Sequence, residues 1–254
     1  MALVLEALGK QVRIVTGDPV PPNLAFIDPD QRIEHLAGDV TLDALSTLEV
    51  MMVLDTSAWA QLGPMGDVLR ADRKIKMVLD HHVSEDDLGA EYFKNTTAEA
   101  TGRLVAEAAM ELGVPLTAEI ATPLYAAQAT DTGWYRFKST TGDALRVAAS
   151  LVDAGAVPQE IYSDIYEQDT LGRLRLRGIV LARTETDLDG RMAHTFLRLS
   201  DFEQSGAVPS DTEDLINLTL AIKGVEFAVI LVEQDLSLIH ISEPTSLGMI
   251  SYAV

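Results

Sequence analysis

The chain of 254 residues contains no cysteine, and this absence narrows the chemistry that it can carry. Without thiols there is neither a disulfide framework nor a thiolate metal site, so a metal centre would have to use oxygen and nitrogen ligands. The sequence also has no apolar run of about twenty residues, the length that spans a bilayer, and no signal peptide. We therefore expect a soluble, cytoplasmic protein.

Basic residues are scarce as well. The chain has 19 Lys and Arg against 39 Asp and Glu, which gives a formal net charge of −20 at pH 7. Proteins that bind long nucleic acids neutralise the phosphates with basic stripes, so this composition disfavours binding of long duplexes and leaves small phosphorylated substrates held through metal ions. Hydrophobic residues make up 47% of the chain, enough for the core of one large or two modest domains.

Two short apolar runs end in acidic residues. Residues 48–54 lead to Asp55-Thr56-Ser57, and residues 75–79 lead to Asp80-His81-His82. Such runs predict buried strands, and in a doubly wound parallel sheet the groups that face a ligand follow the carboxyl ends of the strands. Asp55 and Asp80 are therefore expected along one sheet edge. Carboxylates and imidazoles can bind a divalent cation, with the spare His left for a substrate anion or a proton.

A third acid follows a predicted helix. Apolar residues recur at helical spacing over 117–130, and Asp131 comes where Thr132-Gly133 breaks the pattern. Taken singly, Asp131 is equally explained as a helix-ending acid, and Asp80-His81-His82 as a solvated turn. Taken together, the three segments predict that Asp55, Asp80-His81-His82 and Asp131 converge on one site.

Local signals predict several further elements. The spacing of Thr96 and Glu99 is that of a capping box and is expected to begin a long helix that Gly113 ends. The turn Asp187-Leu188-Asp189-Gly190 predicts a hairpin with strands at 181–186 and 192–199. Further strands are expected at 11–16, 91–93 and 225–232, and further helices at 141–154, 158–168 and 171–183.

The three motifs in this order resemble those of the DHH phosphoesterase superfamily: a strand followed by Asp-Thr-Ser, then Asp-His-His, then Thr130-Asp131-Thr132-Gly133-Trp134-Tyr135-Arg136-Phe137. The resemblance runs from residue 1 to about Gln234 and is closest to the branch of bifunctional oligoribonucleases and 3′-phosphoadenosine-5′-phosphate phosphatases. It implies an α/β fold with a doubly wound, mainly parallel sheet. It also implies a catalytic domain at 1–170, a helical linker at 171–183 and a smaller, partial substrate-binding domain (DHHA1-like) at 184–235.

The resemblance implies two-metal hydrolysis of short RNA or 3′-phosphoadenosine 5′-phosphate, with Mn²⁺ as the metal and Mg²⁺ or another divalent ion as an alternative. In this scheme Asp55 bridges the two ions, and His81 and Asp131 complete the coordination of the second. Asp80 either ligates or orients. The implied metal ligands are thus Asp55, Asp80, His81 and Asp131.

The resemblance further implies that His82 bonds the scissile phosphate and stabilises its developing charge. Arg136 is expected to contact the substrate phosphate, with Lys138 as an alternative. An aromatic ring in this segment would suit a nucleobase, but Trp134 and Phe137 are expected in the core.

Both ends of the chain depart from the family pattern. The family's upstream His…Asp-x-Asp motif is not found, and Asp28-Pro29-Asp30 with His35 follows a proline-rich loop that favours a surface turn. Residues 236–254 fit neither the family pattern nor strand alternation and are expected to be a non-native tail. We therefore expect a chain truncated at both ends and catalytically silent as it stands.

Two other functions remain open. A manganese-dependent inorganic pyrophosphatase has a related motif set, although Asp131-Thr132-Gly133-Trp134 and the hairpin favour the nuclease branch. The second alternative is a nucleotide-binding or scaffold protein without catalysis. The sequence gives no indication of oligomeric state.

Overall fold

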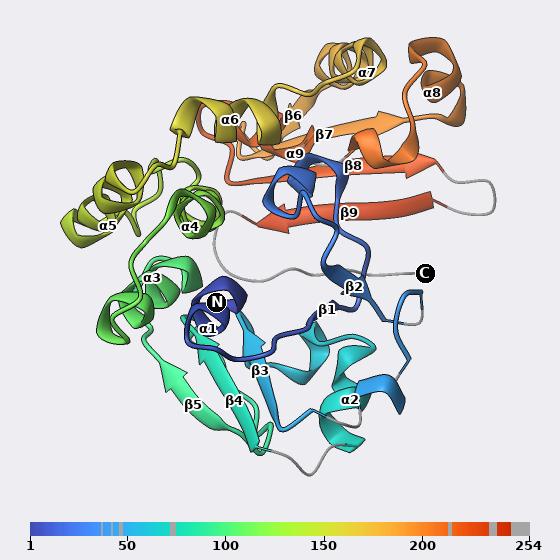
Figure 1. Ribbon diagram of the computed structural model, residues 1–254. Helices are drawn as coiled ribbons and strands as arrows, with labels where there is room; N and C mark the ends of the chain where they lie inside the picture. The colour runs from blue at the N-terminus through green and yellow to red at the C-terminus, as the bar shows by residue number, and fades with distance from the viewer. Residues whose placement is uncertain are drawn as a thin grey trace. The chain divides into compact units, whose positions relative to one another are not determined.

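The computed structural model describes residues 1–36, 38–41, 43–45, 48–71, 75–212, 215–233 and 238–244. The chain divides into two compact units, Met1–Glu167 and Gln168–Val254, each with its own hydrophobic core. Both units combine helices with sheets that contain parallel strands (Figure 1). This confirms the expected α/β fold. Among the described helices, none has the length and apolar composition needed to cross a membrane.

The sheet that positions the candidate site lies in the first unit and runs in the order β3-β4-β5. Its strands are β3 (Val50–Leu54), β4 (Ile75–Asp80) and β5 (Glu91–Lys94), and all three are parallel (Figure 1). The backbone N–H of Asp55 continues the ladder by donating to the carbonyl of Leu79 at 3.0 Å. The residues that follow β3 and β4 are therefore neighbours at one edge, as the two apolar runs predict.

A second pair of parallel strands precedes this sheet. These are β1 (Ile14–Thr16) and β2 (Ile33–His35), and Ile14 lies opposite Ile33. The short helix α1 (Ala2–Ala7) comes before β1 and is followed by Gly9, whose φ of 76° is a conformation that glycine adopts at little cost. The other short helices of this region are η1 (Pro22–Ile27), η2 (Asp43–Leu45), η3 (Trp59–Gln61) and α2 (Met65–Ala71).

Four longer helices complete the first unit: α3 (Thr101–Glu111), α4 (Ala118–Asp131), α5 (Gly142–Asp153) and α6 (Pro158–Tyr166). Helices α3 and α4 approach closely at Gly102, where an added Cβ would lie 2.9 Å from the Cβ of Ala127. The capping-box prediction is wrong, because α3 begins at Thr101 after Ala100, which makes no side-chain cap. Glu99 is instead 4% exposed and accepts hydrogen bonds from Gln128 and Arg103. A buried carboxylate requires such partners, and this requirement outweighs a cap.

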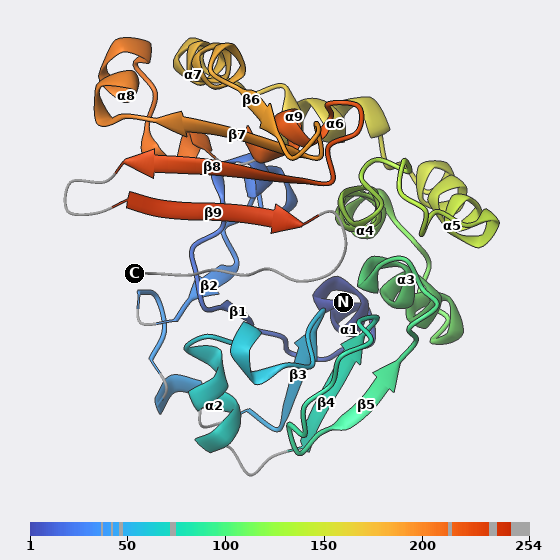
Figure 2. The ribbon, with the colours of Figure 1, turned by 180° about the vertical axis from the view of Figure 1, so that it is seen from behind.

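The second unit packs helices on one mixed sheet in the order β6-β7-β8-β9 (Figure 2). The strands are β6 (Glu185–Asp187), β7 (Met192–Leu197), β8 (Phe227–Glu233) and β9 (Leu238–Pro244). Strands β7 and β8 are parallel, whereas β6 pairs with β7 and β9 with β8 in antiparallel fashion. The helices are α7 (Leu171–Ala182), α8 (Leu199–Ser205), η4 (Pro209–Thr212) and α9 (Leu215–Leu220).

Two elements of this unit differ from expectation. The strand predicted at 181–186 begins only at Glu185, because α7 continues to Ala182. The same helix, expected as a linker, contributes the fully buried Leu176 and Val180 to the unit's core. The stretch expected to lack strand structure after Gln234 forms β9 over 238–244, since pairing with the edge of β8 needs only backbone groups. The rest of that tail, 236–237 and 245–254, lies outside the described residues.

Candidate metal centre and active site

His81 stands between two carboxylates at the carboxyl edge of the sheet. Its Nε2 lies 3.6 Å from Oδ1 of Asp55 and 3.6 Å from Oδ2 of Asp131. Asp55 follows β3, His81 follows β4, and Asp131 is the last residue of α4. The parallel alignment of the strands thus places two of these groups, and the end of a helix distant in sequence supplies the third.

The protonation of His81 follows from its other ring nitrogen. Nδ1 lies 3.2 Å from the main-chain carbonyl of Ala98. A carbonyl oxygen can only accept, so Nδ1 carries a proton, and in the neutral imidazole Nε2 has a lone pair on the side of Asp55 and Asp131. Histidines that bind metal ions commonly donate their second N–H in this way, which fixes both the tautomer and the ring orientation.

His81 makes a pair of donors with each carboxylate, and the spacing of each pair fits a divalent cation. Two donor atoms about 2.0–2.2 Å from one ion are separated by roughly 3–4 Å when they lie beside each other in its coordination shell, and the observed separations are 3.6 Å. Asp55, His81 and His82 also form a group whose ligand atoms lie within 4.8 Å of one another. An oxygen and nitrogen donor set of this kind suits Mn²⁺, Mg²⁺ or Zn²⁺.

Electrostatics favour a cation at this position. Burial, followed by the negative charge of Asp55, raises the pKa of the Asp131 carboxyl to about 6. Two carboxylates and an imidazole lone pair that face one another repel when all are deprotonated. A bound cation would relieve this repulsion, and protonation of Asp131 relieves it at low pH.

Asp55 adopts an unusual backbone conformation. Its φ of 66° lies in the left-handed region, which Asp tolerates better than most residues because its short side chain bonds locally. The backbone bond from Asp55 to Leu79 holds the residue there. Sparsely populated conformations of this kind concentrate at binding and catalytic positions.

Asp80 is held by hydrogen bonds from its neighbours. It is fully buried, and each of its oxygens already has partners: Oδ1 accepts from the backbone N–H of His82 at 3.2 Å and from its Nδ1 at 2.7 Å, while Oδ2 accepts from Ser57 Oγ at 2.6 Å. Burial alone would raise the pKa of Asp80, but the hydrogen bonds from Ser57 and His82 outweigh it and hold the pKa below its usual value. Of the two expected roles, orientation agrees with these contacts, and metal ligation by Asp80 stays a prediction.

His82 lies beside His81, with their ring centroids 4.4 Å apart. Its Nδ1 bonds Asp80, and its side chain is 40% exposed, so Nε2 is the nitrogen left for a ligand.

The sequence did not single out Ser57 for a role or Lys94 at all. The signal for Lys94 was its place directly after the strand expected at 91–93, since the rule that placed Asp55 and Asp80 applies to β5 as well.

The segment after Asp131 makes a left-handed turn, with positive φ at Gly133, Trp134 and Tyr135. Trp134 packs edge-to-face against Tyr162 at 4.9 Å and against the first unit's core, as expected. The core prediction for Phe137 is wrong: the residue is 53% exposed, because the turn carries its ring over Gly133, where a Cβ would collide with it. Arg136 is exposed, and its Nε donates to the carbonyl of Gly133 at 2.7 Å.

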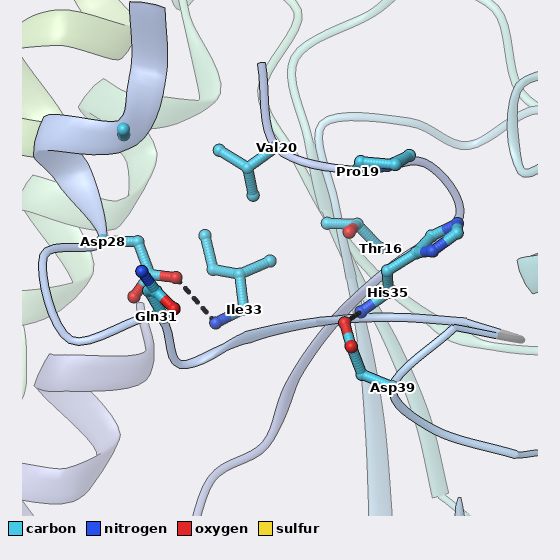
Figure 3. A pocket seen from close by; sticks show the side chains of 9 residues that line it. Thr16, Pro19, Val20, Asp28, Gln31, Ile33, His35 and Asp39 are labelled. Atoms are coloured by element: carbon cyan, nitrogen blue, oxygen red, sulfur yellow. Dashed lines mark hydrogen bonds between the residues drawn. The ribbon is translucent and has the colours of Figure 1, made fainter. Parts of the chain in front are cut away.

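Asp28 and His35 line a separate cavity of about 190 Å³ (Figure 3). Both oxygens of Asp28 accept from the backbone, at 2.9 Å from the N–H of Arg32 and 2.8 Å from that of Ile33. His35 Nε2 lies 3.0 Å from the carbonyl of Gly17. These contacts agree with the surface-turn interpretation of Asp28-Pro29-Asp30 and not with a role as metal ligands.

Fold and site together define the class: an α/β protein with a candidate divalent-cation site at the carboxyl edge of a parallel sheet. No family model matches the chain. It is 30% identical over 236 residues to the bifunctional oligoribonuclease and PAP phosphatase NrnA of Thermus thermophilus, covering 91% of this chain and 66% of that protein. It is 27% identical over 162 residues to NrnA of Bacillus subtilis, covering 63% of this chain and 51% of that protein.

Solved structures share the fold. An exopolyphosphatase-related protein from Bacteroides fragilis superposes with a TM-score of 0.89 at 22% identity, over 96% of this chain and 73% of the other. A putative family II inorganic pyrophosphatase from Methanococcus jannaschii gives a TM-score of 0.52 at 17% identity, over 96% of this chain and 81% of the other. The chain belongs to the DHH phosphoesterase superfamily. It spans less than two thirds of the length of the two curated relatives.

Proposed function

We propose that this chain carries the catalytic site of a metal-dependent phosphoesterase that hydrolyses short oligoribonucleotides and 3′-phosphoadenosine 5′-phosphate. The observation that carries the proposal is the position of His81 Nε2 beside the carboxylates of Asp55 and Asp131, each 3.6 Å away. The substrate class comes from the two relatives named as oligoribonucleases and PAP phosphatases. A cytoplasmic location stays a prediction.

In the proposed mechanism Asp55, His81 and Asp131 would hold the cation, which we take to be Mn²⁺, and the second oxygen of Asp55 would serve another ion. A bound cation of this kind polarises a phosphoryl oxygen and lowers the pKa of a coordinated water. Side chains of this protein bind and orient the substrate. Asp80 fixes the ring of His82 through Nδ1, and Nε2 of His82 meets a phosphate oxygen of the substrate. Arg136, at the surface after Asp131, is the proposed contact to a further phosphate.

The pyrophosphatase alternative has less support. The pyrophosphatase neighbour, at 17% identity, shares the fold alone, whereas the relative with 30% identity is an oligoribonuclease and PAP phosphatase. The pyrophosphatase alternative can be tested in the same assay, because both activities would use the same carboxylates and imidazoles at the sheet edge.

The test has two readouts. Calorimetric titration of residues 1–254 with Mn²⁺ should show binding that Asp55→Ala abolishes or weakens. Turnover of short ribonucleotides, 3′-phosphoadenosine 5′-phosphate and pyrophosphate is then compared, for residues 1–254 and for a version extended at both ends from its reading frame. Faster turnover of pyrophosphate than of either nucleotide would contradict the proposal, and comparable turnover of the two versions would contradict the expectation that residues 1–254 are silent.

A further inference from the structure

Lys94 is a nearly buried cation beside the candidate site. It ends β5, lies opposite Asp80 in the sheet register, and its side chain is 11% exposed. Its Nζ lies 2.7 Å from Ser57 Oγ and 2.6 Å from the carbonyl of Ser84, the residue two positions after His82. It also lies 3.5 Å from Oδ2 of Asp80 and 3.4 Å from a carboxylate oxygen of Glu85. One ammonium thus joins the ends of three strands and the loop that follows the His pair.

The two oxygens of Asp80 have separate partners. Oδ2 accepts from Ser57 and faces Lys94, whereas Oδ1 accepts only from His82. A fully buried carboxylate is costly to desolvate unless it is paired and hydrogen-bonded. Lys94 supplies the counter-charge, and Ser57 fixes the rotation of the carboxylate.

We propose that Lys94, acting with Ser57, is a positioning residue for the reaction: it holds Asp80 so that Oδ1 stays on Nδ1 of His82 and Nε2 of His82 is presented to the substrate phosphate. The catalytic consequence rests on the proposed function, whereas the positioning of His82 does not. Lys94 also holds the carbonyl of Ser84, so the acid and the loop after His82 are fixed by the same cation.

The absence of cysteine permits a selective test on the full chain. Lys94→Cys introduces a single thiol, and alkylation with 2-bromoethylamine then rebuilds a side chain of lysine length that ends in an ammonium. In the version extended at both ends, with any cysteine outside residues 1–254 replaced by serine, we expect Lys94→Cys to lower kcat about 10–100-fold, the usual effect of losing such an outer contact. KM and Mn²⁺ affinity should change little, because Asp55, His81 and Asp131 are untouched. Alkylation should restore most of kcat. Lys10→Cys, at an exposed position, is the matched control and should lose no activity before or after alkylation.

A second readout needs no turnover. In NMR spectra of the wild-type chain, the Nδ1 proton of His82 should be protected from exchange by its 2.7 Å bond to Asp80. Lys94→Cys should broaden or abolish that signal, and alkylation should restore it. If Lys94→Cys does not fold, Ser57→Ala takes its place and should weaken the signal while leaving the ammonium in place.

The outcomes separate the two proposals. If the version extended at both ends turns over neither nucleotide but the His82 signal of residues 1–254 depends on Lys94, the proposed function fails and the positioning stands. An unchanged His82 signal in a folded Lys94→Cys or Ser57→Ala variant overturns the positioning. So does a kcat loss that alkylation does not restore, or that a lower Tm accounts for entirely.

Discussion

At the scale of the single residue, the carboxyl of Asp131 reports most directly on the candidate metal centre. Its pKa is raised from 3.8 to about 6, first by burial and then by the negative charge of Asp55. Between these two values the folded chain binds more protons than the unfolded chain, so this group makes the metal-free protein less stable as pH rises from about 4 to about 6.

We predict that Asp131→Asn removes this dependence. In a chelating buffer, the free energy of unfolding of the variant should gain on the wild type by about 1–2 kcal/mol between pH 4 and pH 6.5, after allowance for solvent screening of a side chain that is 34% exposed. Denaturant titrations at both pH values measure it. Saturating Mn²⁺ should stabilise the wild type more than the variant; a pH-independent difference without metal would contradict the assignment.

Asp55→Ala and His82→Ala should fail in different ways. The first removes a donor next to His81 Nε2, so calorimetry with Mn²⁺ should show weaker binding or fewer sites. The second removes a ring whose Nδ1 bonds Asp80 and whose Nε2 we assign to substrate, so metal binding should stay near normal while turnover falls. Equal Mn²⁺ affinity of Asp55→Ala and the wild type would contradict a ligand role for Asp55.

The sequence singled out Asp55, His81 and Asp131 because acids and imidazoles after apolar runs are visible locally. The structure places the carboxylates of Asp55 and Asp131 each 3.6 Å from His81 Nε2. The sequence could not reveal which partner each oxygen of Asp80 takes, since Ser57 and Lys94 reach that residue across two strands. The exposure of Phe137 was equally hidden, because it depends on three successive left-handed residues.

At the scale of the element, the approach of α3 to α4 determines how far apart the donors lie. The carbonyl of Ala98, which anchors His81, lies just before α3, and Asp131 ends α4. The buried bond between Glu99 and Gln128 joins the two segments. Periodicity predicted both helices, but not this bond, because the capping-box pattern assigned Glu99 to a local role.

We predict that Gly102→Ala pushes α3 away from α4. The new Cβ would lie 2.9 Å from Ala127 Cβ and 3.1 Å from the carbonyl of Leu124, so we expect a loss of about 1–3 kcal/mol in the free energy of unfolding and a weaker Mn²⁺ affinity.

Gly178→Ala is the matched control. Among the described residues, nothing lies within 4 Å of its added Cβ inside α7, so this variant should gain about 0.5–1 kcal/mol and bind Mn²⁺ normally. Unaltered metal affinity in Gly102→Ala would show that helix spacing does not control the donors.

At the scale of the whole molecule, the net charge of −20 governs encounters with anionic substrates. A protein that binds nucleic acid through basic stripes loses affinity steeply as salt rises, because counterions are released on binding. Here the general field repels phosphates, and we expect attraction at the proposed metal centre and at cations such as Arg136.

We predict that KM for short ribonucleotides stays level or falls as ionic strength rises from about 0.01 to 0.15 M, a range over which the Debye length shortens from about 30 to 8 Å. Added duplex RNA should compete poorly at either salt concentration. Steady-state kinetics at fixed free Mn²⁺ measure both quantities. A steep rise of KM with salt would reveal a basic substrate path that the composition does not suggest.

The hydrogen bond between His81 and the main chain of Ala98 also affects which substitutions the protein tolerates. Its acceptor is a main-chain carbonyl, which every residue type at position 98 carries. Substitution there can change the fit of the side chain but cannot delete the atom that selects the imidazole tautomer. In a saturation library, therefore, positions 55, 81 and 131 should be sharply restricted, whereas position 98 should accept any residue small enough for its buried surroundings.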